Sequence, residues 1–81
     1  MAWVYILRGS SGRYYIGSTE NLTRRLEEHR RGGNHTTHRL GDLEVVISRV
    51  VGDATEARKI EFALKRKKNP RLAIRALEKL A

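Results

Sequence analysis

Residues 3–17 read Trp-Val-Tyr-Ile-Leu-Arg-Gly-Ser-Ser-Gly-Arg-Tyr-Tyr-Ile-Gly, a pattern typical of a β-hairpin. Its first five residues are β-branched, aromatic or aliphatic, which is typical of a strand. Residues 9–12 are a turn signal, and residues 14–17 predict the returning strand of a β-hairpin. Because side chains alternate along a strand, Tyr5 and Tyr15 share one face if they lie opposite each other. A register shift of one residue would place the two rings on opposite faces.

A helix and a third strand are predicted after the hairpin. Asn21 is the preferred N-cap of the helix, because its short side chain accepts hydrogen bonds from the first free amides. The helix is expected over residues 22–31 and ends at residues 32–33, which are both glycine. Residues 44–51 form a near-continuous apolar run, which indicates a central strand covered on both faces.

Two further helices complete the predicted order. Asp53 and Glu56 form a capping-box pattern at the start of a helix over residues 54–68. Proline is tolerated at the first position of a helix, so Pro70 begins a third helix that is expected over residues 70–80. The order ββαβαα describes an α+β, or mixed α/β, domain in which a small three-stranded sheet and the helices share one core.

The composition fits one small domain over residues 1–81 and excludes several functional classes. The chain has no cysteine, which rules out a disulfide, a thiolate metal site and a cysteine nucleophile. No apolar run reaches the roughly 18 residues that a membrane span needs. The N-terminus also lacks a signal-peptide pattern. We therefore expect a cytoplasmic protein with no membrane partner.

The charge points to a polyanionic partner. The formal net charge is +8, and nucleic acid is the first candidate, ahead of a membrane surface. Residues 1–53 carry eight basic and six acidic side chains, whereas residues 54–81 carry nine and three. The C-terminal third should therefore supply most of the long-range attraction to phosphate, and that attraction should be sensitive to salt.

Polar residues interrupt the apolar stripes of the first two predicted helices. Each stripe follows the i, i+3, i+4, i+7 spacing of one helix face. The first contains Leu22, Arg25, Leu26 and His29, and the second contains Ala57, Ile60, Glu61 and Leu64. Both stripes are expected to face the same small sheet. Three polar side chains then converge with two tyrosines, and the expected set is Arg25, His29, Glu61, Tyr5 and Tyr15.

Each polar side chain on a stripe also has a structural explanation. Arg25 can extend along the core until its charge reaches water. His29 is favoured near a helix C-terminus by the helix dipole. Glu61 can pair with Arg25 or with a lysine, or it can bind a metal ion.

Together these residues suit phosphodiester chemistry. Arg25 supplies a fixed cation for charge on a phosphate. Glu61 supplies a hard oxygen ligand for one largely hydrated Mg²⁺ ion. A tyrosine or histidine can accept a proton from water, and a nearby arginine or metal favours the phenolate form of tyrosine. The residues alone leave open whether Tyr5, Tyr15 or His29 is the base.

The motifs resemble those of the GIY-YIG endonuclease domain, from Trp3 to about Asn69. Trp3-Val4-Tyr5 stands where that family has Gly-Ile-Tyr, so tryptophan replaces the glycine. The second motif is intact as Tyr15-Ile16-Gly17, and a helix pattern and a glutamate helix follow it. These read Asn21-Leu22-x-x-Arg25-Leu26-x-x-His29 and Ala57-x-x-x-Glu61-x-x-x-Lys65.

The resemblance implies a metal-dependent endonuclease that hydrolyses DNA on a three-stranded antiparallel sheet flanked by helices. One of Tyr5 and Tyr15 would orient or deprotonate the attacking water. Arg25 would stabilise the scissile phosphate, and His29 would hydrogen-bond a tyrosine or share the base role. Glu61 would hold one Mg²⁺ or Mn²⁺ ion. Gly17 would let the backbone and helix approach closely where a side chain would intrude.

The expected substrate is DNA of a particular shape, because a bare catalytic module has little surface for reading sequence. Flapped, branched, nicked or single-stranded DNA are the candidates, with RNA left open and a role in DNA repair or recombination expected. The expected nucleic-acid contacts are Lys65, Arg66, Lys67, Lys68, Arg71 and His38. The alternative is a basic nucleic-acid-binding module with the same fold and no catalysis.

Four further residues have a functional and a structural interpretation. His38 aligns loosely with a second family histidine and His35 is a further candidate, but a polar surface loop is favoured for both. Asn69 lies near a family asparagine that helps the active site, but N-capping of the last helix is favoured. Ser18 and Thr19 can contact phosphate, or they can start the first helix.

Overall fold

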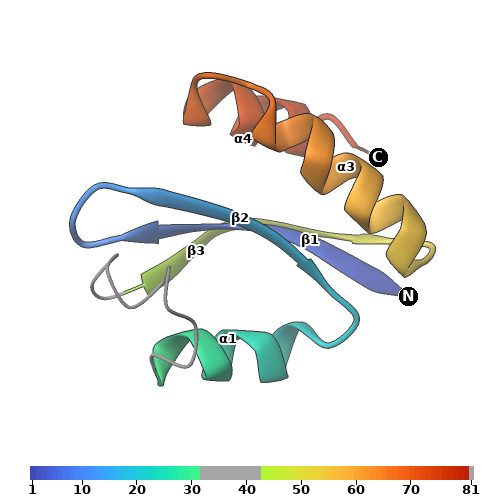
Figure 1. The fold of residues 1–81 in the computed structure, drawn as a ribbon, viewed down its shortest axis with the longest axis horizontal. Helices are drawn as coiled ribbons and strands as arrows, with labels where there is room; N and C mark the ends of the chain where they lie inside the picture. Colours follow the sequence, from blue (N-terminus) through green and yellow to red (C-terminus); the bar gives the residue numbers. More distant parts are fainter. Residues whose placement is uncertain (32–42, 81) are drawn as a thin grey trace.

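Three antiparallel strands form one sheet, with helices on both of its faces (Figure 1). The computed structural model describes residues 1–31 and 43–80. The elements are β1 (Ala2–Gly9), β2 (Tyr14–Thr19), α1 (Leu22–Arg30), β3 (Leu43–Val51), α3 (Ala54–Lys65) and α4 (Pro70–Glu78). Helix α1 lies on one face of the sheet, and α3 and α4 cover the other (Figure 1). The predicted α+β fold and the order ββαβαα are confirmed.

The β1–β2 hairpin places the two motif tyrosines on the same face. Tyr5 pairs with Gly17, and Tyr15 pairs with Leu7 two residues farther along β1. An offset of two residues preserves the face, so the predicted sharing is confirmed although the rings are diagonal neighbours. The hairpin turn contains Gly12 at φ 88°, a left-handed conformation that glycine adopts without strain.

The predicted central position of the third strand is wrong. The strand order is β2-β1-β3, so β1 is the central strand and β3 is an edge. Four consecutive β1 residues are buried, whereas Val45, Val46 and Val50 of β3 are exposed. The apolar runs of β1 and β3 look alike in the sequence. Such a run indicates which faces of a strand are covered, but it does not indicate how many neighbouring strands pair with it. A bulge also interrupts the β1–β3 pairing, a common feature of edge strands.

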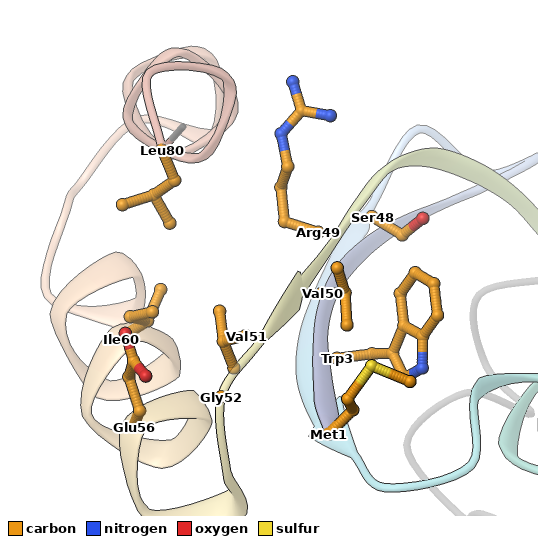
Figure 2. Close-up of a pocket in the computed structure, with 10 residues that line it drawn as sticks. All are labelled: Met1, Trp3, Ser48, Arg49, Val50, Val51, Gly52, Glu56, Ile60 and Leu80. Atoms are coloured by element: carbon orange, nitrogen blue, oxygen red, sulfur yellow. The ribbon is translucent and has the colours of Figure 1, made fainter.

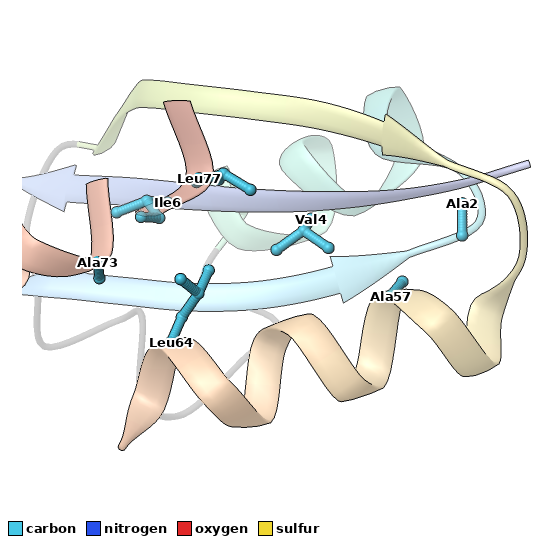
Figure 3. Packing of buried hydrophobic residues seen from close by; sticks show 7 residues of the cluster. All are labelled: Ala2, Val4, Ile6, Ala57, Leu64, Ala73 and Leu77. Carbon is cyan, nitrogen blue, oxygen red and sulfur yellow. The ribbon is translucent and has the colours of Figure 1, made fainter. Parts of the chain in front are cut away.

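The main core lies between the sheet and the helices α3 and α4 (Figure 3). Alternate residues of β1 point into it, because side chains alternate along a strand. The buried cluster comprises Ala2, Val4, Ile6, Ala57, Leu64, Ala73 and Leu77. The intervening residues of β1, including Tyr5, therefore face α1. Burying a side chain such as Leu77 stabilises the fold by about 1.5–3 kcal/mol.

The starts of all three helices follow the predicted capping residues. The side-chain oxygen of Asn21 accepts a hydrogen bond from the Arg24 amide at 3.0 Å. Asp53 accepts one from the Glu56 amide at 2.7 Å, which confirms it as the N-cap of α3. Asn69 similarly accepts one from the amide of Arg71 at 2.9 Å, so its capping role is confirmed.

The helix ends differ from the prediction. Helix α1 ends at Arg30 and α4 at Glu78, one and two residues early. Helix α3 ends at Lys65, so the predicted helical residues 66–68 lie beyond it. Asn69 must be extended to cap α4 before Pro70, and the chain needs several residues to leave one helix and start the next. The predicted glycine stop at residues 32–33 lies outside the described residues.

Candidate active site

Tyr5, Tyr15 and His29 form an aromatic cluster between the sheet and α1. The Tyr5 hydroxyl and His29 Nε2 are hydrogen-bonded at 2.9 Å. The Tyr15 ring centroid lies 5.0 Å from that of His29 and 6.4 Å from that of Tyr5. Tyr5 and His29 are buried, whereas Tyr15 is partly exposed. Tyr15 is therefore the tyrosine of the pair that solvent can reach.

Gly17 makes room for the Tyr5 phenol. A Cβ atom at this position would lie 2.5 Å from the Tyr5 hydroxyl oxygen and 2.7 Å from its Cζ atom. Both separations are far below ordinary van der Waals contact. Close approach was expected from the backbone and the helix, but the group that lies over Gly17 is the Tyr5 ring. The glycine of the second motif thus fixes the position of the tyrosine of the first.

Arg25 of α1 places a cation beside this cluster. Its Nη1 atom donates to Glu28 Oε2 at 3.0 Å, and its side chain is 34% exposed. Hydrogen bonding to Tyr5 is the largest influence on the guanidinium and raises the pKa of Arg25. Arg25 therefore stays charged while part of its side chain faces solvent. Glu28 was missed in the sequence analysis, although its i+3 spacing from Arg25 is a recognisable signal.

Burial sets the charge states of the two hydrogen-bonded groups. Desolvation raises the pKa of Tyr5 above its ordinary value, and this outweighs hydrogen bonding to Arg25. Arg25 does favour the phenolate of Tyr5, as expected, but burial outweighs it, so the pKa of Tyr5 is raised. Desolvation lowers the pKa of His29, and the positive charge of Arg25 lowers it further. Both groups are neutral at neutral pH.

Glu61 reaches the sheet from the opposite face. Its helix, α3, packs across the sheet from α1 (Figure 1), so the two polar stripes face different sides of the sheet. The hydroxyl of Ser18 on β2 donates to Glu61 Oε1 at 2.5 Å. Lys65 Nζ lies 2.6 Å from Glu61 Oε2, so the predicted lysine pairing is confirmed.

Of the five side chains that were expected to converge, four do so and one does not. Tyr5, Tyr15, Arg25 and His29 gather on the α1 face, and Glu61 is held at strand β2. The negative charge of Glu61 still contributes to the raised pKa of Tyr5, so the carboxylate acts on the cluster electrostatically. Ser18 as a partner of Glu61 was missed. The signal was its place beside Gly17, where alternation turns its side chain toward the α3 face.

The donor chemistry at Glu61 fits one hard divalent cation. In the described part of the chain, no group of three or more histidine, aspartate and glutamate residues could hold a metal ion. Glu61 offers one carboxylate, with the Ser18 hydroxyl against it. Mg²⁺ commonly keeps several waters and takes one or two carboxylates from a protein, so this donor set suits it.

The residues expected to contact nucleic acid lie at the end of α3 and beyond it. Lys65 pairs with Glu61. The Arg66 guanidinium lies 6.0 Å from the centre of the Phe62 ring. Lys67, Lys68 and Arg71 are exposed, between α3 and the first turn of α4. His35 and His38 lie outside the described residues.

A pocket at the β3 edge is separate from these residues (Figure 2). Trp3, Val50, Ile60 and Leu80 are among its lining residues, and the lining includes none of the expected site residues. The aromatic cluster is thus a feature of the sheet face and not of this pocket. Within residues 1–31 and 43–80, no helix has the length and apolar character needed to cross a membrane.

Comparison with known proteins shows the family to which the chain belongs. The family model of the GIY-YIG catalytic domain matches residues 1–73. A UPF0213 protein of Pectobacterium carotovorum is 36% identical over 64 residues, covering 78% of this chain and 65% of that protein. One from Photorhabdus laumondii is 37% identical over 65 residues, covering 78% and 62%. One from Streptococcus pneumoniae is 37% identical over 71 residues, covering 85% and 71%.

No solved structure matches the chain. The match spans less than two thirds of the length of the Pectobacterium and Photorhabdus relatives. The family match nevertheless covers both tyrosine motifs, the arginine–histidine helix and the glutamate helix. This chain belongs to the GIY-YIG family, and its residues 1–73 match the catalytic domain of that family.

Proposed function

We propose that residues 1–81 form one nuclease domain, a divalent-metal-dependent endonuclease that hydrolyses phosphodiester bonds in DNA. One observation carries the proposal. A buried, neutral Tyr5–His29 pair lies beside a charged Arg25 and a partly exposed Tyr15 on one sheet face. A buried polar pair is satisfied internally, so the groups that meet solvent are free to meet substrate.

The exposure of each side chain indicates its role in the proposed reaction. Arg25 is the cation for the scissile phosphate, because it stays protonated and is partly exposed. Tyr15 is the phenol that orients the attacking water. Tyr5 and His29 are positioning residues, because both are buried. Their hydrogen bond fixes the Tyr5 and His29 rings, and the Tyr15 ring lies against both.

Glu61 is the residue that would hold Mg²⁺ or Mn²⁺. A bound divalent ion stabilises negative charge on phosphate oxygens as a Lewis acid. In the structure the carboxylate is neutralised by Lys65, whose side chain is half exposed. The Lys65 side chain, which is 51% exposed, can extend into water when a cation takes its place at Glu61.

The substrate proposed is DNA recognised by shape, with a role in repair or recombination. The exposed basic residues beyond α3, such as Lys67 and Lys68, bind phosphates regardless of sequence. A domain of this size offers little further surface for base readout. Flapped, branched, nicked and single-stranded DNA are therefore better candidates than a defined duplex sequence.

A cleavage assay tests the proposal. End-labelled duplex, flapped, branched and single-stranded DNA, with matched RNA, are incubated in Mg²⁺, Mn²⁺ or EDTA. We expect metal-dependent cleavage of DNA by the wild type and by Glu56→Gln, an exposed control on the same helix. Glu61→Gln should not cleave. Cleavage by purified Glu61→Gln at the wild-type rate would refute the role of Glu61.

One observation favours a second candidate, a nucleic-acid-binding module without catalysis. The Lys65–Glu61 ion pair at 2.6 Å occupies the carboxylate that a metal would need. Such a module would bind DNA in a salt-dependent way and yield no product in any metal. We favour the nuclease, because a binding module has no need of all five positions Tyr5, Tyr15, Arg25, His29 and Glu61 that this chain carries.

A further inference from the structure

Phe62 is the exposed aromatic side chain of α3. It is 65% exposed, although an aromatic ring of this size normally gains from burial. The opposite side of α3 contributes Ala57 and Leu64 to the core, so Phe62 is not a member of the packed face. The fold therefore does not account for an aromatic residue at this position.

Basic residues surround Phe62 on the helix surface. Residues three and four apart are neighbours on a helix, and all four such neighbours of Phe62 carry positive charge. They are Arg58, Lys59, Lys65 and Arg66, and all are exposed. The Arg66 guanidinium lies over the Phe62 ring, 6.0 Å from its centre. We call Phe62 and these four residues the Phe62 platform.

The Phe62 platform adjoins the candidate metal ligand. Glu61 precedes Phe62 and turns toward Ser18 on β2, while Phe62 faces solvent. Lys65 belongs to both groups, because it pairs with Glu61 and is a helix neighbour of Phe62. A strand lying on the platform would thus have a phosphate close to the carboxylate.

We propose that the Phe62 platform binds an unpaired nucleotide of single-stranded DNA. The base stacks on Phe62, and the flanking phosphates lie against the four cations. Aromatic rings with neighbouring positive charge are the usual means of binding single strands, whereas bases in a duplex are already stacked and do not reach a ring. The proposal rests on the proposed nuclease function and specifies a substrate with an unpaired segment.

The positive charge around Phe62 favours single-stranded DNA over a membrane surface as the ligand of the platform. Four cations around one ring suit a polyanion that also carries flat apolar groups. A membrane surface would take up several apolar side chains, but the apolar stripe of α3 is buried in the core. Uptake by anionic vesicles that depends on Phe62 would overturn the assignment.

Binding is measured by fluorescence anisotropy in EDTA, so that no cleavage occurs. The probes are a labelled oligothymidine and an abasic strand of equal length, which keeps the phosphates and lacks the bases. We expect the wild type to prefer oligothymidine. Phe62→Ala should weaken oligothymidine binding about tenfold and leave abasic binding unchanged, the size expected for one stacked base. Phe62→Tyr should retain the preference.

Leu72→Ala is the matched control, because Leu72 is a 51% exposed apolar residue on α4 next to basic Arg71. It should bind both strands like the wild type. Circular dichroism and thermal unfolding of each variant establish that it is folded. Equal weakening of both strands by Phe62→Ala, or no weakening of either, would overturn the proposal. Tighter binding of a matched oligouridine would overturn the assignment to DNA.

The binding assay separates this proposal from the nuclease function. It uses neither metal nor cleavage. If Phe62-dependent base preference is found and no DNA is cut, the nuclease proposal fails alone. If DNA is cut and the wild type does not distinguish oligothymidine from the abasic strand, the platform fails alone.

Discussion

At the scale of single residues, the site depends on one steric relation. The Tyr5 phenol lies over Gly17 so closely that a Cβ atom there would be 2.5 Å from its oxygen. The same phenol is hydrogen-bonded to His29 at 2.9 Å, so its position determines that of the imidazole. The two motifs are therefore coupled through direct contact, and a change in one displaces the other.

Gly17→Ala should destabilise the domain and misplace Tyr5. Overpacking of a tight site typically costs about 1–3 kcal/mol in the free energy of unfolding. Urea denaturation measures it. Gly52→Ala is the control, since the nearest atom to its Cβ is the flexible end of Glu56 at 3.2 Å. If both variants were equally stable, the close packing of Tyr5 on Gly17 would be refuted.

His29 should make stability depend on pH. Burial and Arg25 lower its pKa from the ordinary 6.5, so the unfolded chain binds a proton before the folded chain does. The stabilising contribution is complete above about pH 6.5 and is lost as the pH falls through the lowered native pKa. Urea titrations of wild type and His29→Gln across this range measure it. The same slope in both proteins would contradict a neutral His29.

Among the helices and strands, α3 contacts the core, strand β2 and solvent with different side chains. Ala57 and Leu64 pack in the core, Glu61 contacts β2, and Phe62 faces solvent. The i, i+4 pair of Glu61 and Lys65 links these roles, because the lysine neutralises the carboxylate that would bind a metal. If Glu61 binds a divalent cation as proposed, Lys65 of the same helix competes with that cation.

Lys65→Gln should therefore raise the affinity for Mn²⁺ several-fold. Removing the ammonium group leaves Glu61 free for the cation. Titration of free Mn²⁺ by electron paramagnetic resonance measures the affinity. Lys59→Gln is the control, because it removes the same charge from the same helix. Glu61→Gln should bind Mn²⁺ most weakly of all the variants. If Lys65→Gln and Lys59→Gln bound Mn²⁺ equally, Lys65 would not compete for Glu61.

The element boundaries show what can be predicted from the sequence. Asn21, Asp53 and Asn69 were all predicted as helix caps, because capping depends on local hydrogen bonds. The place of β3 in the sheet was not predicted correctly, because pairing is a non-local property. The predicted helix continued to residue 68, directly before Asn69 and Pro70, but the cap at Asn69 requires an earlier end.

The candidate site was likewise predicted where local spacing determines it and was not predicted where the packing of distant elements does. Tyr5, Tyr15, Arg25 and His29 were grouped correctly, since period-2 and period-3.6 spacing place each on the face it occupies. The separate position of Glu61 was not foreseen. Helical spacing shows that a stripe faces a sheet, but it does not show which face. The Ser18–Glu61 contact depends on that choice.

At the scale of the whole molecule, the positive charge is concentrated away from the aromatic cluster. The net charge is +8, and residues 54–81 carry nine of the 17 basic residues. They include α3 and α4, which lie across the sheet from α1 (Figure 1). Under the proposed function, DNA attracted by these helices must also reach Arg25 on the other face, and the contact of Glu61 with Ser18 lies at β2, one edge of the sheet.

The salt dependence of DNA binding tests this distribution. Replacing Lys67 and Lys68 with glutamine should reduce the slope of log affinity against log salt by about 1.8 on duplex DNA, the loss of two phosphate contacts. Replacing Arg8 and Arg13 at the hairpin removes the same charge and should change the slope little. Equal changes would mean that net charge, not the C-terminal basic residues, attracts DNA.

We expect cleavage to depend above all on Arg25, which lies beside the Tyr5–His29 pair on this face of the sheet. The most direct test compares single-turnover cleavage of labelled DNA by the wild type, Arg25→Ala and Arg24→Ala. Both arginines contact Glu28, but Arg24 is 78% exposed and Arg25 is 34% exposed beside the phenols. We expect Arg25→Ala to slow cleavage at least about 100-fold, as loss of a preorganised charge does. Arg24→Ala should cleave nearly as the wild type does. Equal rates for the two variants, with both folded, would show that Arg25 has no special role in cleavage.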